Sequence, residues 1–325
     1  MISHHSVSLP WRRGALLLLI LASGSCANAS RTVELPAVGS LQQDPEQVLR
    51  YWTPERMSNA ANIQDPADLA PFEPPLGGDE KGYLKMSSPY VIKMESRVTG
   101  ILFYHNARMD ADTHCSASIL QSTTKSLIIT AAHCTIFPNP GGEAFSQHML
   151  FVPAYDGSPG RTVAEMAPYG MWPVSRAYVS ANVAQNPIII IGSQFDLSVA
   201  SVHPNEEGRR LEEVVGSALH PVVSESESFA KALTAGYPSA NYGGQSQYYC
   251  KTALSNLPYG AAGVGDPAAG SLGASNCGVT GGHSGGPIIV GQGVVGVVHG
   301  GDHTRLRPST FPAQLAAAET DFPLP

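Results

Sequence analysis

The stretch Thr280-Gly-Gly-His-Ser-Gly-Gly-Pro287 places one serine, Ser284, inside a turn that is rich in glycine. Glycines permit a tightly bent backbone that exposes the serine hydroxyl, and they let a substrate carbonyl approach the neighbouring N–H groups. Upstream, Leu127-Ile-Ile-Thr-Ala-Ala-His-Cys134 carries His133 at the end of an apolar run, and Asp196 lies in the apolar stretch 194–202. The sequence therefore supplies a nucleophile, a base and an orienting carboxylate.

The order of these three residues along the chain decides between two folds. Residues 282–286 also match G-x-S-x-G, the nucleophile elbow of α/β-hydrolases, in which the acid and the histidine follow the serine. Only 41 residues follow Ser284, and Asp302 and His303 are too close to it to complete such a site. The order of the three residues therefore argues against an exported esterase whose nucleophile is an elbow serine. The order histidine, aspartate, serine is that of the chymotrypsin-type double barrel.

The apolar runs after Pro89 are short and are bounded by turn residues, which is typical of an all-β sandwich or barrel. The predicted strands are residues 98–104, 127–130, 149–152, 188–191, 232–235 and 294–298. One helix is predicted near the C-terminus, Phe311–Thr320. Only 14% of the 325 residues are charged, against about a quarter in an ordinary soluble domain. With 33 glycines and 26 prolines, this composition argues against a coiled coil or a long helical array.

The N-terminus has the pattern of a secretory signal. Arg12 and Arg13 precede the apolar run 15–22, and Ala27-Asn28-Ala29 then supplies the small residues that a signal peptidase accepts. The apolar run is too short to span a bilayer, for which about 20 residues are needed. Residues 1–29 are therefore predicted to be a cleaved signal peptide, and the exported protein is expected to have no membrane contact after cleavage.

Residues 30–88 differ from the rest of the chain, because they hold seven prolines and no cysteine. Short helices are predicted at Glu46–Tyr51 and at Pro54–Ala61, and Pro71–Gly78 is predicted to be a linker. This segment is interpreted either as an extended N-terminal arm or as a propeptide that is removed when a zymogen matures. The remaining residues, 89–325, are predicted to form the functional domain.

Four cysteines remain once the signal peptide with Cys26 is removed, and an even number in an exported chain indicates two disulfides. Three pairings are open, of which the most local joins Cys115 with Cys134 and Cys250 with Cys277. Either closure would contribute about 3 kcal/mol. The net charge of -7, without basic runs, gives no electrostatic footprint for nucleic acid. A monomer is expected.

Three segments resemble, in order, the signature blocks of chymotrypsin-like serine proteases. They are Ile129-Thr-Ala-Ala-His-Cys134, Phe195-Asp-Leu-Ser-Val-Ala200 and Gly281-Gly-His-Ser-Gly-Gly-Pro287. Residues 151–155, 167–170 and 51–56 resemble the bacterial secreted branch that includes glutamyl endopeptidases. The resemblance spans residues 98–301. It implies an all-β fold of two six-stranded antiparallel barrels with a C-terminal helix, preceded by the Pro-rich arm.

The same resemblance implies a secreted serine endopeptidase, a hydrolase acting on protein or peptide substrates. Ser284 would be the nucleophile, His133 the general base and then acid, and Asp196 the group that fixes the histidine tautomer. The backbone N–H groups of Gly282 and Ser284 would form the oxyanion hole. No metal and no organic cofactor is implied. The alternative is a catalytically silent, secreted binding protein on the same fold.

One departure from the family pattern concerns activation. In the animal enzymes an aspartate precedes the serine and captures the new N-terminal ammonium after activation, whereas here His283 occupies that place. A histidine supplies no fixed negative charge near neutral pH. Activation by that salt bridge is therefore not expected.

The specificity pocket is the second departure. Gly278 stands where trypsin carries its aspartate, so a preference for Lys or Arg has no visible basis. Thr280 and His299 resemble the residues with which the glutamyl branch recognises acidic side chains, which favours a preference for acidic residues. An offset of one residue would instead put Val298 at the expected position, and one residue reverses the face of a strand. His299 would then point toward Asp196.

Overall fold

The structure is a computed structural model in which the described residues are 1, 36–61, 79, 81–139, 142–185, 194–226, 228–239, 242–257, 271–274, 276–299 and 303–321. The predicted signal peptide beyond Met1, the predicted linker 71–78 and the predicted strand 188–191 lie outside these residues. All elements below belong to the folding unit that begins at Val33.

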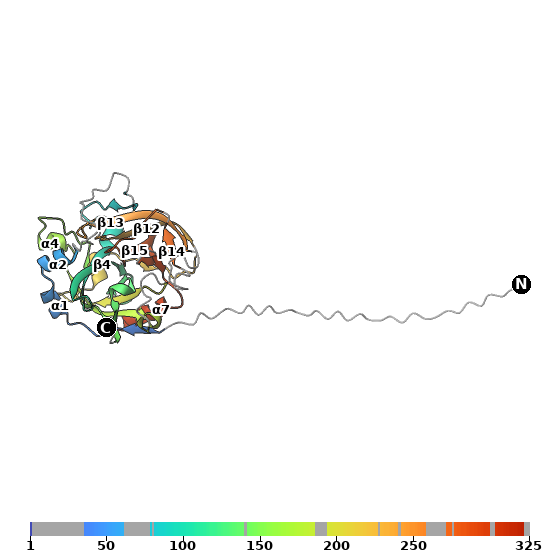
Figure 1. Cartoon of the computed structure of the whole chain (residues 1–325), viewed down its shortest axis with the longest axis horizontal. Helices are drawn as coiled ribbons and strands as arrows, with labels where there is room; N and C mark the ends of the chain where they lie inside the picture. Colours follow the sequence, from blue (N-terminus) through green and yellow to red (C-terminus); the bar gives the residue numbers. More distant parts are fainter. Residues whose placement is uncertain are drawn as a thin grey trace. The chain divides into compact units, whose positions relative to one another are not determined.

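Six strands close into a first antiparallel barrel, because the two ends of the sheet pair with each other (Figure 1). The order around the ring is β9-β10-β5-β4-β3-β8, and β8 pairs back to β9. The strands are β3 (Thr99–Asn106), β4 (Ala111–Leu120), β5 (Leu127–Thr130), β8 (Gln147–Pro153), β9 (Trp172–Ser180) and β10 (Ser198–Val202). Closure removes the unpaired edges that an open sheet would expose.

A second ring of six antiparallel strands follows in the sequence. Its order is β16-β15-β12-β13-β14-β17, and β17 pairs back to β16. The strands are β12 (Ser228–Gly236), β13 (Tyr248–Asn256), β14 (Leu272–Ala274), β15 (Pro287–Val290), β16 (Gly293–Val298) and β17 (His303–Arg305). The predicted all-β double barrel is therefore confirmed, and the predicted strands 127–130, 149–152, 232–235 and 294–298 lie within β5, β8, β12 and β16.

The N-terminal arm adds two helices and two short strands to these barrels. β1 (Ala37–Gly39) pairs with β9, and β2 (Leu84–Lys85) pairs with β13. Helix α1 (Pro45–Tyr51) begins after Asp44, whose carboxylate accepts the N–H groups of Glu46 and Gln47. Helix α2 (Pro54–Ala61) follows directly, as the sequence predicts.

The arm helices cover the outer face of β3. Successive side chains of a strand point to opposite faces, so Leu102 lies in the barrel core while Ile101 and Phe103 point outward. Both outward side chains are nevertheless fully buried, because Trp52 and Met57 of the arm pack over them. Residues 36–61 are thus part of the packing of the first barrel in the full-length chain.

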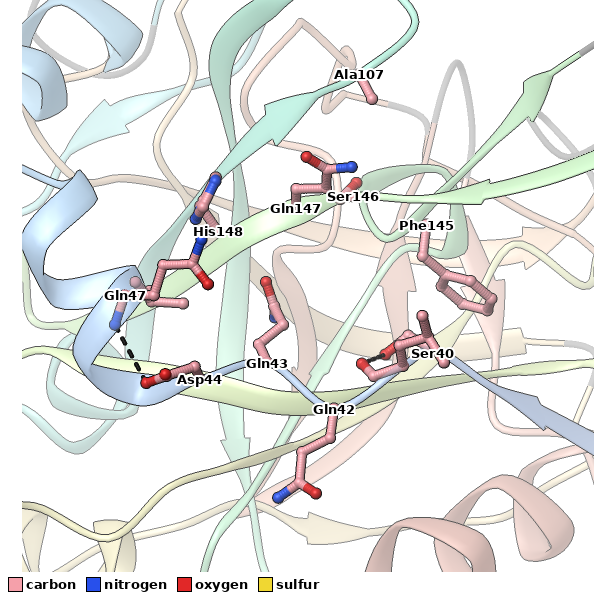
Figure 2. A pocket seen from close by; sticks show the side chains of 12 residues that line it. Ser40, Gln42, Gln43, Asp44, Gln47, Ala107, Phe145, Ser146, Gln147 and His148 are labelled. Carbon is pink, nitrogen blue, oxygen red and sulfur yellow. Dashed lines mark hydrogen bonds between the residues drawn. The ribbon is translucent and has the colours of Figure 1, made fainter.

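A hollow remains beneath the arm where α1 meets β8. Figure 2 shows its lining, which includes Gln43, Asp44 and Gln47 of the arm and Gln147 and His148 of β8. None of the three candidate catalytic residues lines it.

The C-terminal helix α7 (Phe311–Thr320) has the predicted bounds and packs on β9 and β10. The smaller elements are β6 (Ile136–Asn139), β7 (Gly142–Phe145), β11 (His220–Pro221), α3 (Met94–Val98), α4 (Val163–Met166), α5 (Ala181–Gln185), α6 (Leu211–Val215) and the 3-10 turn η1 (Ala132–Cys134). Among the described residues, no helix has the length and apolar character needed to cross a bilayer.

Both disulfides follow the local pairing. Cys115 on β4 is joined to Cys134 in η1, and Cys250 on β13 is joined to Cys277. The first bond ties the end of β5 to the neighbouring strand. The second ties the segment before the serine turn to the second barrel.

Candidate active site

His133 lies in η1, one short turn after β5 ends at Thr130. The turn is closed by the hydrogen bond from Cys134 N–H to Ala131 O, at 3.1 Å. Because the next residue, Cys134, is bonded to Cys115 of β4, the turn is fixed on both sides. The imidazole is held at the rim of the first barrel and is 14% exposed.

Asp196 holds His133 by two hydrogen bonds and is fully buried directly before β10. Its Oδ1 accepts the backbone N–H of His133 at 2.9 Å, and its Oδ2 accepts the ring Nδ1–H at 2.7 Å. A neutral imidazole bonded in this way has its free lone pair on Nε2. The pair therefore presents Nε2 as a proton acceptor.

Asp196 also sets the basicity of the His133 imidazole. Burial by itself lowers the pKa of His133, but the negative charge of Asp196 and its hydrogen bond outweigh burial and leave the pKa above its usual value. The imidazolium that forms when His133 accepts a proton is thus stabilised in place. This is the property that a general base needs when it later donates the proton again.

Ser284 belongs to a turn before β15 that rests against the first barrel. The carbonyl of Ser284 accepts the N–H of Ser116 on β4 at 2.7 Å. A side-chain carbon added to Gly285 would lie 2.9 Å from the backbone nitrogen of Ala131, two residues before His133. The turn that carries the serine and the turn that carries the histidine are therefore in contact across the two barrels.

Hydrogen bonds fix the direction of two peptide groups in this turn, the one that joins Gly281 to Gly282 and the one that joins His283 to Ser284. The carbonyl of Gly281 accepts Ser239 N–H at 2.8 Å, and the carbonyl of His283 accepts Gly286 N–H at 2.9 Å. In a trans peptide the N–H points away from the carbonyl of the same unit. The N–H groups of Gly282 and Ser284 therefore both point away from these bonds, and neither donates to a described residue.

Gly282 must be glycine for this arrangement to exist. Its φ is +81°, and a side-chain carbon there would lie 2.5 Å from both His114 Nε2 and Tyr237 O. Its carbonyl accepts the hydroxyl of Ser116 at 2.8 Å. Two N–H groups that have no acceptor among the described residues, one of them on the serine itself, are donors of the kind that stabilises an oxyanion.

The three specificity candidates lie at different depths. Gly278 is exposed, Thr280 is 7% exposed, and His299 is fully buried directly after β16. Neither ring nitrogen of His299 has a hydrogen-bond partner among the described residues. Burial lowers its pKa to about 4, against the opposing charge of Asp196, so the ring is neutral near pH 7.

Potential metal-binding donor atoms gather at one place in the described part of the chain. Among the described residues, one group has donor atoms close enough for a shared ion, namely Cys115, His133 and Cys134. Its two sulfurs are joined in a disulfide. Since metals bind the thiolate form, this group offers His133 alone as a ligand.

Comparisons with known proteins agree with the fold. No protein-family model and no curated protein matches the chain. Among solved structures, protease Anisep from Arthrobacter nicotinovorans superposes with a TM-score of 0.56 at 24% identity, covering 70% of this chain and 98% of that one. The thermostable serine protease AL20 from an extremophilic microorganism gives 0.53 at 23% identity, covering 71% and 100%.

A Glu endopeptidase structure also superposes, with a TM-score of 0.53 at 15% identity, covering 75% of this chain and 100% of that one. These likenesses, together with the two closed barrels, establish that the chain has the chymotrypsin-like serine protease fold. The antiparallel rings also exclude the α/β-hydrolase fold that the G-x-S-x-G match admits.

Sequence reasoning missed the residues that hold the serine turn from outside. Ser116 and His114 lie on β4 among ordinary strand residues, and Tyr83 lies in the arm. His114 is buried between Tyr237 O at 2.8 Å and Ala60 O at 3.1 Å. No spacing rule connects these residues to position 284, because their contacts are long-range.

Proposed function

We propose that the protein is a secreted serine endopeptidase. Ser284 Oγ attacks the carbonyl carbon of a peptide bond while its proton passes to His133 Nε2. The tetrahedral intermediate collapses when His133 returns the proton to the leaving amine, which leaves an acyl-enzyme ester on Ser284. Water then attacks the ester, His133 accepts its proton, and the acid product leaves as Ser284 is protonated again.

Two features of the turns that carry His133 and Ser284 support this proposal. Asp196 holds Nδ1 of His133 and leaves Nε2 free. The N–H groups of Gly282 and Ser284 point away from the hydrogen bonds that the carbonyls of Gly281 and His283 accept. A fixed base and a pair of unpaired donors have no evident structural purpose at a protein surface. Together they supply proton transfer and charge stabilisation for acyl transfer.

Secretion is part of the proposal, and so is a zymogen that matures by removal of an N-terminal segment within residues 30–88. Two disulfides fit an oxidising compartment, and the predicted signal peptide gives the route. The proposed substrates are proteins or peptides, and the enzyme would act as a monomer without a cofactor.

A preference for acidic residues at the cleaved bond is the finer part of the proposal. Gly278 offers no carboxylate, and the stem of Lys81 lies against it: a side-chain carbon built on Gly278 would be 3.3 Å from Lys81 Cβ. The Gly278 N–H also donates to Lys81 O at 2.9 Å. A cation beside this position favours acidic side chains. A peptide library with Glu, Asp, Gln or Ala before the cleaved bond tests it, and equal cleavage of the Glu and Gln peptides would reject it.

The test of the main proposal compares the secreted wild-type protein with Ser284→Ala. Wild type is expected to hydrolyse peptides and to bind one phosphonofluoridate per chain, on Ser284. The variant is expected to lose about a millionfold in turnover and all labelling. A folded wild-type protein that neither cleaves peptides nor reacts with the reagent would instead support the alternative, a catalytically silent secreted binding protein on this fold.

A further inference from the structure

Tyr83 connects the N-terminal arm to the serine turn through a fully buried hydroxyl. The hydroxyl donates to Gly278 O at 2.7 Å and also contacts His283 Nδ1. The Tyr83 hydroxyl therefore joins the carbonyl of Gly278 to the ring of His283. His283 is 1% exposed and lies between the two peptide groups that carry the candidate oxyanion donors.

The residues around Tyr83 are built into the second barrel. Asp79 Oδ1 accepts the N–H groups of Lys81 and Tyr83 at 2.8 and 2.9 Å, which forms a tight turn. Gly82 in this turn has a φ of +79°, and a side-chain carbon there would lie 1.8 Å from Asn276 O. Tyr83 packs in a cluster with Tyr248 and with the disulfide of Cys250 and Cys277. Removing this segment would leave a hole in the barrel directly beneath the serine turn.

His283 is suited to a neutral contact. Burial lowers its pKa to about 3, and the nearby His303 adds to this effect. Burial raises the pKa of Tyr83 above its usual value. Both groups are therefore uncharged over the range in which proteins normally work, and the bond between them does not depend on pH there.

We propose that Tyr83 is a positioning residue for the oxyanion hole, and that residues 79–85 stay in the active enzyme. This inference rests on the proposed function. The Tyr83 hydroxyl fixes the ring of His283, and the ring fixes the peptide groups that present the N–H groups of Gly282 and Ser284. A neutral hydrogen bond from an upstream segment thus orders the turn without a free N-terminal ammonium. The boundary of any removed segment then lies before Asp79 and not at residue 88.

The test uses the full-length chain with Tyr83→Phe, which removes one oxygen and keeps the ring. Loss of a whole oxyanion donor costs about 100- to 1000-fold in kcat, so loosening the donors is expected to cost about tenfold. KM is expected to change by less than about twofold, because the lost interaction acts on the transition state. Unchanged kcat in a folded Tyr83→Phe protein would overturn the inference, and an inactive wild type would overturn the proposed function instead.

Tyr242→Phe is the matched control. Its hydroxyl contacts Asp79 Oδ2, and its ring packs edge-on against Tyr83 at 5.2 Å. Tyr242 therefore holds the same segment of the arm in place, but its hydroxyl contacts no residue of the serine turn. It is expected to lower the melting temperature with kcat unchanged. If kcat falls equally in both variants, the effect is general loosening and the positioning role is wrong.

If Tyr83→Phe does not fold, two further measurements test the inference. Incorporation of 3-fluorotyrosine at position 83 keeps the ring and the hydroxyl but changes the hydrogen-bonding strength of the hydroxyl, so kcat is expected to change at constant melting temperature. Constant kcat there would contradict the inference. Mass spectrometry of the active, phosphonofluoridate-labelled protein is expected to find an N-terminus at or before Asp79. Labelled protein that begins after Tyr83 would overturn the second part.

Discussion

The two halves of the candidate site are held in different ways. The base half, His133 with Asp196, is complete within the first barrel: both hydrogen bonds join neighbouring segments of that barrel. The nucleophile half, the turn around Ser284, belongs to the second barrel but is held by groups from elsewhere. The hydroxyl of Ser116, in the first barrel, donates to Gly282 O. Tyr83 of the arm contacts His283, the residue that precedes Ser284.

This difference assigns separate tasks to the two halves. The base half needs an invariant distance between two side chains, which one barrel with a disulfide supplies. The nucleophile half needs several peptide groups to keep one orientation, and a glycine-rich turn has many alternatives to it. Contacts from three parts of the chain remove those alternatives. Disturbing the base half is therefore expected to change proton transfer, whereas disturbing the nucleophile half is expected to change charge stabilisation.

The largest expected effect tests whether the halves act as one unit. His133→Ala and Ser284→Ala are each expected to lower kcat by about a millionfold, and the double variant is expected to be no worse than either. The reason is that the hydroxyl is a poor nucleophile without the base, and the base has nothing to activate without the hydroxyl. Turnover of a peptide anilide measures all three proteins. Additive losses in the double variant would show that the halves work independently.

Asp196→Asn is expected to lower kcat by about ten-thousandfold, because the amide stabilises the wrong tautomer of His133. It also changes the pH profile. Activity requires neutral His133, so in wild type it is lost as pH falls through the raised pKa of His133. Without the carboxylate only burial acts on the ring, so the acid limb of kcat/KM is expected to move to lower pH. An acid limb that stays in place would mean that another group titrates.

Ser116→Ala tests the support of the nucleophile half. Ser116 Oγ donates to Gly282 O and accepts Tyr237 N–H, both at 2.8 Å. Its loss leaves both groups unpaired, which costs about 1–3 kcal/mol of stability. Because Gly282 carries a candidate oxyanion donor, kcat is expected to fall about tenfold, less than for loss of the donor itself.

Ser118→Ala is the control for this variant, since Ser118 lies two residues along β4 on the same face. Its buried hydroxyl has no partner among the described residues. Stability is expected to change by less than about 0.5 kcal/mol, with kcat unchanged. Equal behaviour of the two variants in thermal melts and in kinetics would remove Ser116 from the site.

The smallest expected effect concerns the arm over the first barrel. Arg56 donates to Asp112 Oδ2 from Nε at 2.9 Å and from Nη2 at 2.6 Å, and Tyr51 donates to Asp112 Oδ1. Arg56→Met in the full-length chain is expected to lower stability by no more than about 1 kcal/mol, because the Arg56 side chain is 43% exposed. The kinetics are expected to stay the same.

Arg50→Met is the matched control for the arm. Its ion pair with Glu46 is mostly exposed on both sides, so no change in melting temperature is expected. A drop in kcat for Arg56→Met would show that the arm over the first barrel also supports the site, which would weaken the distinction between the two halves.

The sequence predicts the base half better than the nucleophile half. The order of His133, Asp196 and Ser284 is enough to choose the double barrel, because that order distinguishes folds that share a G-x-S-x-G match. The strands in the barrels follow from short apolar runs, and the C-terminal helix has the predicted bounds Phe311–Thr320. The local pairing of the cysteines also agrees with the structure.

The supports of the serine turn are not visible in the sequence for a physical reason. Ser116 and Tyr83 lie 166 and 200 residues from their partners Gly282 and His283, and neither sits in a motif. The composition distinguishes residues 30–88 from the rest of the chain. It does not show that Trp52 and Met57 cover an apolar face of the first barrel, or that Tyr83 is buried beneath the serine turn. Such contacts depend on packing between distant segments.

The central claim is that Ser284 forms an acyl-enzyme, and trapping that intermediate tests it most directly. An activated ester is mixed with the protein below the pKa of His133, where deacylation is slow, and the quenched protein is digested and analysed by mass spectrometry. One acyl group per chain is expected on the peptide that contains Ser284, and none is expected in Ser284→Ala. Hydrolysis without an adduct, or an adduct on another residue, would contradict it.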